Sequence, residues 1–299
     1  MSHVQQSSQN PTMNARLASL LNCFSIEVTL PNEAELDELR NVLNTATLIY
    51  VSAPLGQSHK QLALVAKQVR QFGFEPVPHI VARSFPDRAS LQDFVQRVTG
   101  EAGVRQALVI AGDVDHPAGP FFDANAVIES DLLQCGGVTH VGISGYPEGH
   151  PKLGEGILSR AFSDKLKSAQ ARGLRVHIVS QFCFDGNQIA YWLRLLRASG
   201  VDVPVKIGLA GPTSVKGLTR YALRCGVRTS FKAVLSGKAT QLFGEMPPDA
   251  IIERFAEALD VKVADNISFH FYSFGGIGRT ARWVTDYRHR VMQQNSHDR

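Results

Sequence analysis

Eight short apolar runs of β-strand character recur along this chain, and segments with helical spacing separate them. The runs lie at residues 24–30, 47–52, 77–82, 106–110, 140–144, 175–181, 205–209 and 267–274. Strands that alternate with helices are typically parallel and joined by crossover connections. Eight such units predict a closed (β/α)8 barrel, the TIM-barrel fold of the α/β class, in a single domain. A doubly wound open sheet is the alternative. The length of 299 residues suits a barrel, since that fold takes roughly 250 residues.

The ends of the chain differ in composition from the middle. Residues 2–10 are rich in Gln and Ser, which is typical of an unstructured terminus. We therefore expect a disordered tail at residues 1–20, the barrel at 21–290 and a C-terminal tail at 291–299. Inside the barrel, Asn32 with Glu35 three residues later predicts a capped helix start after the first strand.

The composition excludes several classes of protein. Lys and Arg are dispersed, the net charge is only +4, and no basic run carries interleaved aromatics, which argues against a nucleic-acid partner. No apolar stretch reaches the ~18 residues of a membrane span. The four cysteines form no C-x-x-C pair, so we expect a reduced cytoplasmic protein without a metal site. Zinc-peptidase, α/β-hydrolase and P-loop motifs are absent.

Polar residues gather at the carboxyl ends of the predicted strands. Asp113 follows the fourth strand, Tyr146 and His150 follow the fifth, Gln181 closes the sixth and Tyr272 lies late in the eighth. In a barrel these ends meet at one rim, where the chemistry of such enzymes takes place. The sequence therefore predicts a site at this rim.

Glu27 is the most unusual of the strand residues. Polar Ser25, Glu27 and Thr29 alternate with apolar neighbours, which should face the helices, so the carboxylate should point into the barrel. A buried carboxylate is either paired or has a raised pKa. A raised pKa suits a general acid. A structural glutamate paired with an interior Arg or Lys is the other interpretation.

Three segments together resemble the methylenetetrahydrofolate reductase family, flavoenzymes of folate one-carbon metabolism. They are Phe24-Ser-Ile-Glu-Val-Thr-Leu-Pro31, Gly145-Tyr-Pro-Glu-Gly-His150 and Ser180-Gln-Phe-Cys-Phe-Asp185. The resemblance extends over residues 24–272. It implies FAD as cofactor, NADH or NADPH as co-substrate and a folate as substrate. The implied reaction interconverts 5,10-methylenetetrahydrofolate and 5-methyltetrahydrofolate, on the route to methionine.

The resemblance also implies roles for individual residues. Glu27 would protonate the folate, and Asp113 would lie close to both flavin and pterin. Gln181 and Tyr272 would bind the substrate; a glutamine offers the donor and acceptor that a pterin edge demands. Contacts to FAD are implied for Asp113 and for a further set: His79, Gly112, Tyr146, His150 and Lys165.

Two positions depart from the family's pattern. Ala111 stands where the family has an arginine before Gly112 and Asp113, and Gly275–Gly276 replace an Asn-Arg pair. These losses keep two alternatives open: a folate-binding barrel that handles one-carbon units without flavin, and a non-catalytic reductase paralogue. A homo-oligomeric assembly is expected in addition.

Overall fold

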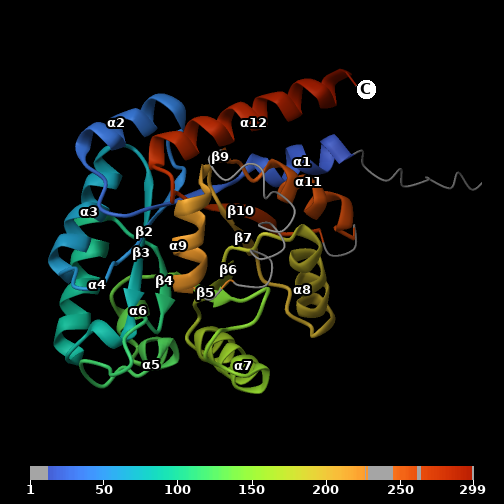
Figure 1. Cartoon of the computed structure of the whole chain (residues 1–299). Helices are drawn as coiled ribbons and strands as arrows, with labels where there is room; N and C mark the ends of the chain where they lie inside the picture. Colours follow the sequence, from blue (N-terminus) through green and yellow to red (C-terminus); the bar gives the residue numbers. More distant parts are fainter. Residues whose placement is uncertain (1–12, 226, 228–244, 261–263, 298–299) are drawn as a thin grey trace, which may run out of the picture.

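The eight predicted strands form a closed parallel barrel in the computed structural model, which describes residues 13–225, 227, 245–260 and 264–297 (Figure 1). The barrel closes where β1 pairs with β10, with Ser25 opposite His270. The predicted (β/α)8 fold is confirmed. The barrel strands are β1 (Ser25–Val28), β2 (Leu48–Val51), β3 (Glu75–Val81), β4 (Gln106–Ile110), β5 (His140–Gly145), β6 (Arg175–Ser180), β7 (Val205–Ala210) and β10 (Ile267–Tyr272).

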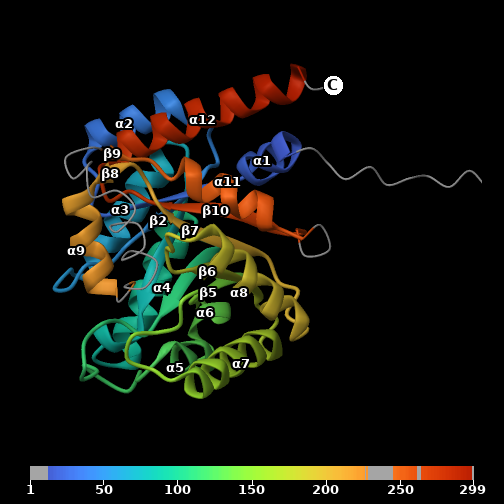
Figure 2. The same ribbon diagram turned by 45° about the vertical axis from the view of Figure 1, so that its right-hand side comes forward.

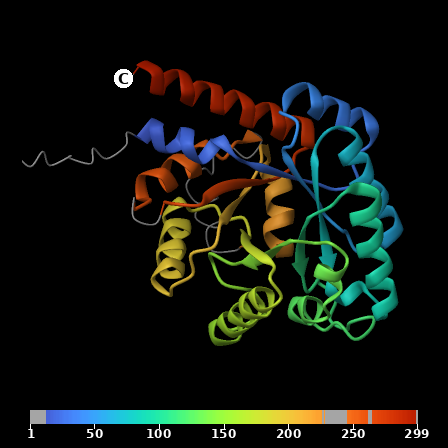
Figure 3. The same ribbon diagram turned by 180° about the vertical axis from the view of Figure 1, so that it is seen from behind.

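Helices surround the barrel, as the view from behind also shows (Figure 3). A short antiparallel ribbon of β8 (Thr213–Ser214) and β9 (Glu245–Met246) stands apart from the barrel sheet. The helical elements that follow β1 are α2 (Glu33–Val42), α3 (His59–Gln71), the 3-10 turn η1 (Ala82–Ser84), α4 (Arg88–Ala102), α5 (Ala124–Glu129), α6 (Leu132–Cys135), α7 (Glu155–Ala171), α8 (Gly186–Ala198), α9 (Val215–Cys225), α11 (Asp249–Ala258) and α12 (Ile277–His297).

Local sequence signals explain where several of these elements begin and end. Asn32 caps α2 and Glu35 completes a capping box, as predicted. The first strand was expected to run to residue 30, but β1 ends at Val28. Leu30 has a φ of 47°, a left-handed conformation that a strand cannot continue through.

Side chains alternate between the two faces of each strand. On β1, Ile26 and Val28 are fully buried in the large core between barrel and helices. Ser25 and Glu27 therefore face the barrel interior. The barrel interior thus receives the polar side chains of β1, beside an apolar cluster formed by Tyr50, Val77, Leu108 and Val179.

Both predicted tail boundaries were wrong. Residues 13–20 belong to a helix, α1 (Met13–Asn22), whose Leu17, Leu20 and Leu21 are buried. At the other end, α12 runs past residue 290, and Val291 is only 3% exposed. Figure 2 shows α1 lying beside α11 and α12. The leucines of α1 recur at helical spacing and form an apolar face, which packs against these two helices. Residues 1–12 and 298–299 lie outside the described residues.

Among the helices in the described ranges, none combines the length and the apolar character needed to cross a membrane.

Candidate active site

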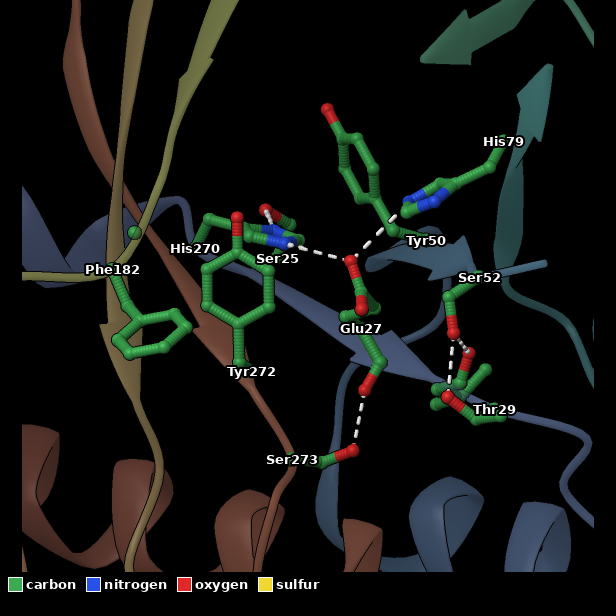
Figure 4. A network of polar contacts seen from close by, with 12 residues as sticks. Ser25, Glu27, Thr29, Tyr50, Ser52, His79, Phe182, His270, Tyr272 and Ser273 are labelled. Carbon is green, nitrogen blue, oxygen red and sulfur yellow. Dashed lines mark hydrogen bonds and ion pairs between the residues drawn. The ribbon is translucent and has the colours of Figure 1, made fainter. Parts of the chain in front are cut away.

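Three strands bring polar side chains together around Glu27. Its carboxylate oxygen Oε2 lies 3.2 Å from Nε2 of His79 on β3 and 3.7 Å from Nε2 of His270 on β10. The two imidazoles approach the carboxylate from either side (Figure 4). The side chains of Glu27, His79 and His270 are 15%, 9% and 0% exposed. The inward orientation predicted for Glu27 is correct, but its partners are histidines instead of an Arg or Lys.

The histidines decide the charge of this carboxylate. Burial alone would raise the pKa of Glu27, but attraction to His79 and His270 outweighs it and lowers the pKa from 4.5 to about 2. Glu27 is therefore ionised at neutral pH. The raised pKa that would make it a general acid by itself is not found. Neither Nε2 atom is aligned for a hydrogen bond with a partner among the described residues, so both contacts are close approaches of an imidazole to the carboxylate.

This depressed pKa predicts a specific loss of stability in acid. A carboxyl whose pKa is lower in the folded than in the unfolded chain stabilises the fold above its unfolded pKa. We expect that contribution to disappear as the pH falls from 4.5 towards 2. Urea unfolding at a series of pH values should show a steeper decline in this window for wild type than for Glu27→Gln. Parallel curves would contradict the assignment.

Hydrogen bonds hold this group in place. Ser25 Oγ lies 2.9 Å from Nδ1 of His270, and Ser273 Oγ donates to the backbone carbonyl of Glu27 at 2.5 Å. The Tyr50 hydroxyl lies 2.8 Å from Nε2 of His177, and the Tyr50 ring packs edge-on against His270. These neighbours were not predicted from the sequence. The pattern that could have indicated His270 is its spacing of two from Tyr272 on β10, which places both side chains on the inward face.

A cleft of about 220 Å³ opens beside the Glu27 group, at the carboxyl ends of β2, β3 and β4. His79 and Asp113, both predicted, lie on its wall. So does Gln57, whose buried Nε2 has no hydrogen-bond partner among the described residues. The remaining lining residues are Ala53, Pro54, Leu55, Gly56, His59, Leu62, Val81, Arg83, Ser84, Val114, His116 and Ala118.

Arg83 carries the only permanent positive charge among these lining residues, and the sequence analysis did not identify it. Its backbone N–H donates to the carbonyl of Ala111, the position where the family resemblance expects an arginine. Its guanidinium donates to the carbonyls of Phe122 at 2.7 Å and Val114 at 2.9 Å. The backbone of Arg83 is therefore joined to position 111, and its guanidinium holds the segment between β4 and α5 in place.

Asp113, Tyr146 and His150 come from neighbouring strand ends and lie near one another. Burial and the charge of Lys152 lower the pKa of His150, and the carboxylate of Asp113 opposes them. The rings of Tyr146 and His150 meet edge-on at 5.0 Å. Gly112, directly before Asp113, has a φ of 97°, which favours glycine.

Gln181 and Tyr272 lie on the other side of Glu27, at the ends of β6 and β10. The Tyr272 hydroxyl donates to the carbonyl of Ser180 at 3.0 Å, and its ring packs edge-on against Phe182 (Figure 4). The Gln181 carboxamide is oriented by its neighbour, since Oε1 accepts from the N–H of Phe182 at 3.1 Å.

Lys165 is not brought to the cleft. It lies on α7, and its electrostatic neighbour is Asp123, which caps α5. Burial lowers the pKa of its ammonium group. The other predicted residues thus gather at one rim, while Lys165 lies in the surrounding helical layer.

The model of the family called methylenetetrahydrofolate reductase matches residues 17–273 of this chain. The chain belongs to the methylenetetrahydrofolate reductase family. Methylenetetrahydrofolate reductase 2 of Saccharomyces cerevisiae is 26% identical over 172 residues, which cover 55% of this chain and 28% of the yeast protein. The 5,10-methylenetetrahydrofolate reductase of Pectobacterium carotovorum subsp. carotovorum is 24% identical over 195 residues, 65% of this chain and 63% of that protein. The matched region thus spans less than two thirds of either relative.

A solved structure shares the fold of this family member. It is an uncharacterized protein from Clostridium thermocellum that binds two copies of 5-methyl-5,6,7,8-tetrahydrofolic acid. The TM-score is 0.59 at 12% identity, with 90% of this chain and 95% of the other covered. At this identity the likeness concerns the barrel alone.

Proposed function

We propose that this protein interconverts 5,10-methylenetetrahydrofolate and 5-methyltetrahydrofolate, with FAD as bound cofactor and NADH or NADPH as co-substrate. The observation that carries the proposal is the Glu27 group: a buried carboxylate between two imidazoles, beside a cleft at the catalytic rim of a reductase-family barrel. Such a group can hold and release a proton in a place shielded from water.

The cleft residues fit the ring end of a flavin. Gln57 Nε2 is a buried donor without a partner, which suits a ring carbonyl, and Asp113 can accept from a ring N–H. Tyr146 and His150 would extend the contact along the rim. When bound, FAD supplies hydride transfer between the nicotinamide and the folate.

The protein's own residues would bind the folate and supply its proton. Opening the methylene bridge requires a proton on the folate nitrogen that leaves, and the Glu27 group, next to the cleft, is a buried source of one. Gln181 and Tyr272 would hold the pterin from the opposite side. Their orientation by the peptides of Phe182 and Ser180 reduces the entropy lost on binding.

A flavin-free reductase or one-carbon enzyme is the second candidate, and two observations favour it. Ala111 removes a guanidinium from the flavin side. The cleft of about 220 Å³ is also smaller than the roughly 300–1,000 Å³ of typical ligand pockets. A non-catalytic paralogue is favoured less, since Glu27, Asp113 and Gln181 are all present.

Titration with FAD separates the two candidates. We expect stoichiometric binding that is about ten- to hundred-fold weaker than with an arginine at position 111, since a lost charge-assisted hydrogen bond costs about 1.5–3 kcal/mol. Calorimetry and flavin fluorescence measure the affinity, and Ala111→Arg is the matched variant, expected to bind FAD more tightly. A wild-type protein that reduces the folate with NAD(P)H but takes up no FAD would establish the flavin-free candidate.

A further inference from the structure

His79 is the residue that connects Glu27 to water. Its Nε2 lies 3.2 Å from the Glu27 carboxylate, and the same side chain lines the cleft. Glu27 itself is not among the cleft-lining residues in the described part of the chain. A proton that reaches or leaves the carboxylate by way of the cleft therefore meets His79 first.

The two histidines next to Glu27 are not equivalent. His270 is fully buried, and that burial lowers its pKa even though the neighbouring Glu27 carboxylate acts in the opposite direction. Its Nδ1 is also engaged with Ser25 at 2.9 Å. His79 lines the cleft, and a proton on its Nε2 would pair with the Glu27 carboxylate 3.2 Å away.

We infer that His79 stores the proton that the folate step consumes, and that it acts through Glu27 and is reprotonated from solvent after the step. This inference rests on the proposed function. Sequence resemblance suggests only a flavin contact for His79. The geometry instead assigns it to a proton-holding pair with Glu27.

The proton and electron balance of the step is simple. The proton leaves Nε2 of His79 and passes over the Glu27 carboxylate to N10 of the folate. The bond between N10 and the methylene carbon breaks, and its electron pair remains on N10, which binds the proton. His79 is left neutral, Glu27 remains a carboxylate, and solvent returns a proton to His79 after the step.

Other ionisable groups surround the pair and shape its titration. Tyr50 does not supply the proton at neutral pH, because burial and the charge of Glu27 raise the pKa of its hydroxyl far above the ordinary value. Within the barrel Tyr50 on β2 and His270 on β10 face Glu27, and Lys206 on β7 acts on His270. The cleft beside His79 is also lined by His59, Arg83, Asp113 and His116.

The first experiment compares His79→Asn with wild type in the folate half-reaction, followed by stopped flow across pH. We expect the rate at pH 7.5 to fall at least about tenfold and the alkaline limb of the pH profile to move to lower pH. The reason is that Glu27 must then hold the proton alone. The opposite result would show that Glu27 is the acid without help from His79. In that case His79→Asn removes a neighbour that lowers the pKa of Glu27, so this pKa rises and the rate of the folate half-reaction is kept or increased. His140→Asn is the control, because His140 is a half-buried histidine outside the cleft, next to Thr139.

Nitrogen-15 NMR of labelled histidines provides a readout that needs no turnover. In wild type at pH 7.5 we expect the signals of one charged imidazole. These signals should vanish in His79→Asn, and they should be replaced by those of a neutral ring in Glu27→Gln. A neutral His79 in wild type would overturn the inference and leave the proposed function standing. A charged His79 in a protein that does not turn over the folate would support the pair and refute the proposed function.

Discussion

Replacing Glu27 by glutamine is expected to slow the folate half-reaction by about 10²–10⁴-fold, the usual effect of losing a positioned acid group. Under the proposed function, reduction of the flavin by NADH or NADPH should stay near the wild-type rate, because hydride would pass from nicotinamide to flavin without a proton donor. An amide of the same size can neither carry a proton nor pair with His79 as an anion. Stopped-flow measurement of each half-reaction tests this separation.

The control for this experiment is Glu101→Gln. Glu101 is a carboxylate on the surface of α4, paired with Lys67 and Arg97, and its side chain is 42% exposed. This variant should leave both half-reactions unchanged. If Glu27→Gln slows both half-reactions equally, Glu27 is a structural residue and leaves the mechanism.

Leu21→Ala is expected to lower the free energy of unfolding by about 2–5 kcal/mol, the range for truncating a buried leucine. Leu21 is 0% exposed, in the helix α1 that packs beside α11 and α12. The matched control is Leu64→Ala on α3, where the leucine is 55% exposed, and there the change should stay within about 0.5 kcal/mol. Urea unfolding of both variants measures the difference. Equal stabilities of Leu21→Ala and wild type would mean that α1 does not support the barrel.

The predicted barrel depended on local patterns, which is why it was confirmed. Alternating strand and helix segments leave few topologies, because crossovers between parallel strands are right-handed and neighbours in sequence pair in space. The strand at Gln106–Ile110 was predicted with its observed bounds. The helix start at Asn32 depends only on residues within one turn, and it too was correct.

The ends of the chain could not be predicted in this way. Leu17, Leu20 and Leu21 are at helical spacing, but a short amphipathic helix is stable only against a surface that covers it. That surface comes from α11 and α12, far along the chain. Local composition therefore suggested a tail where the tertiary structure has a packed helix.

The sequence by itself determined that this chain folds into a barrel, because strand and helix segments alternate eight times along it. It also determined that Glu27 faces the barrel interior, because side chains alternate between the two faces of a strand. Only the tertiary structure decided the charge of that carboxylate. Closure of the barrel between β1 and β10 brings His270 to Glu27, and the path of β3 brings His79. Whether a buried carboxyl gains or loses its proton depends on which groups face it. Those groups are set by the register of distant strands, so tertiary contacts turned an expected acid into an ionised partner of two histidines.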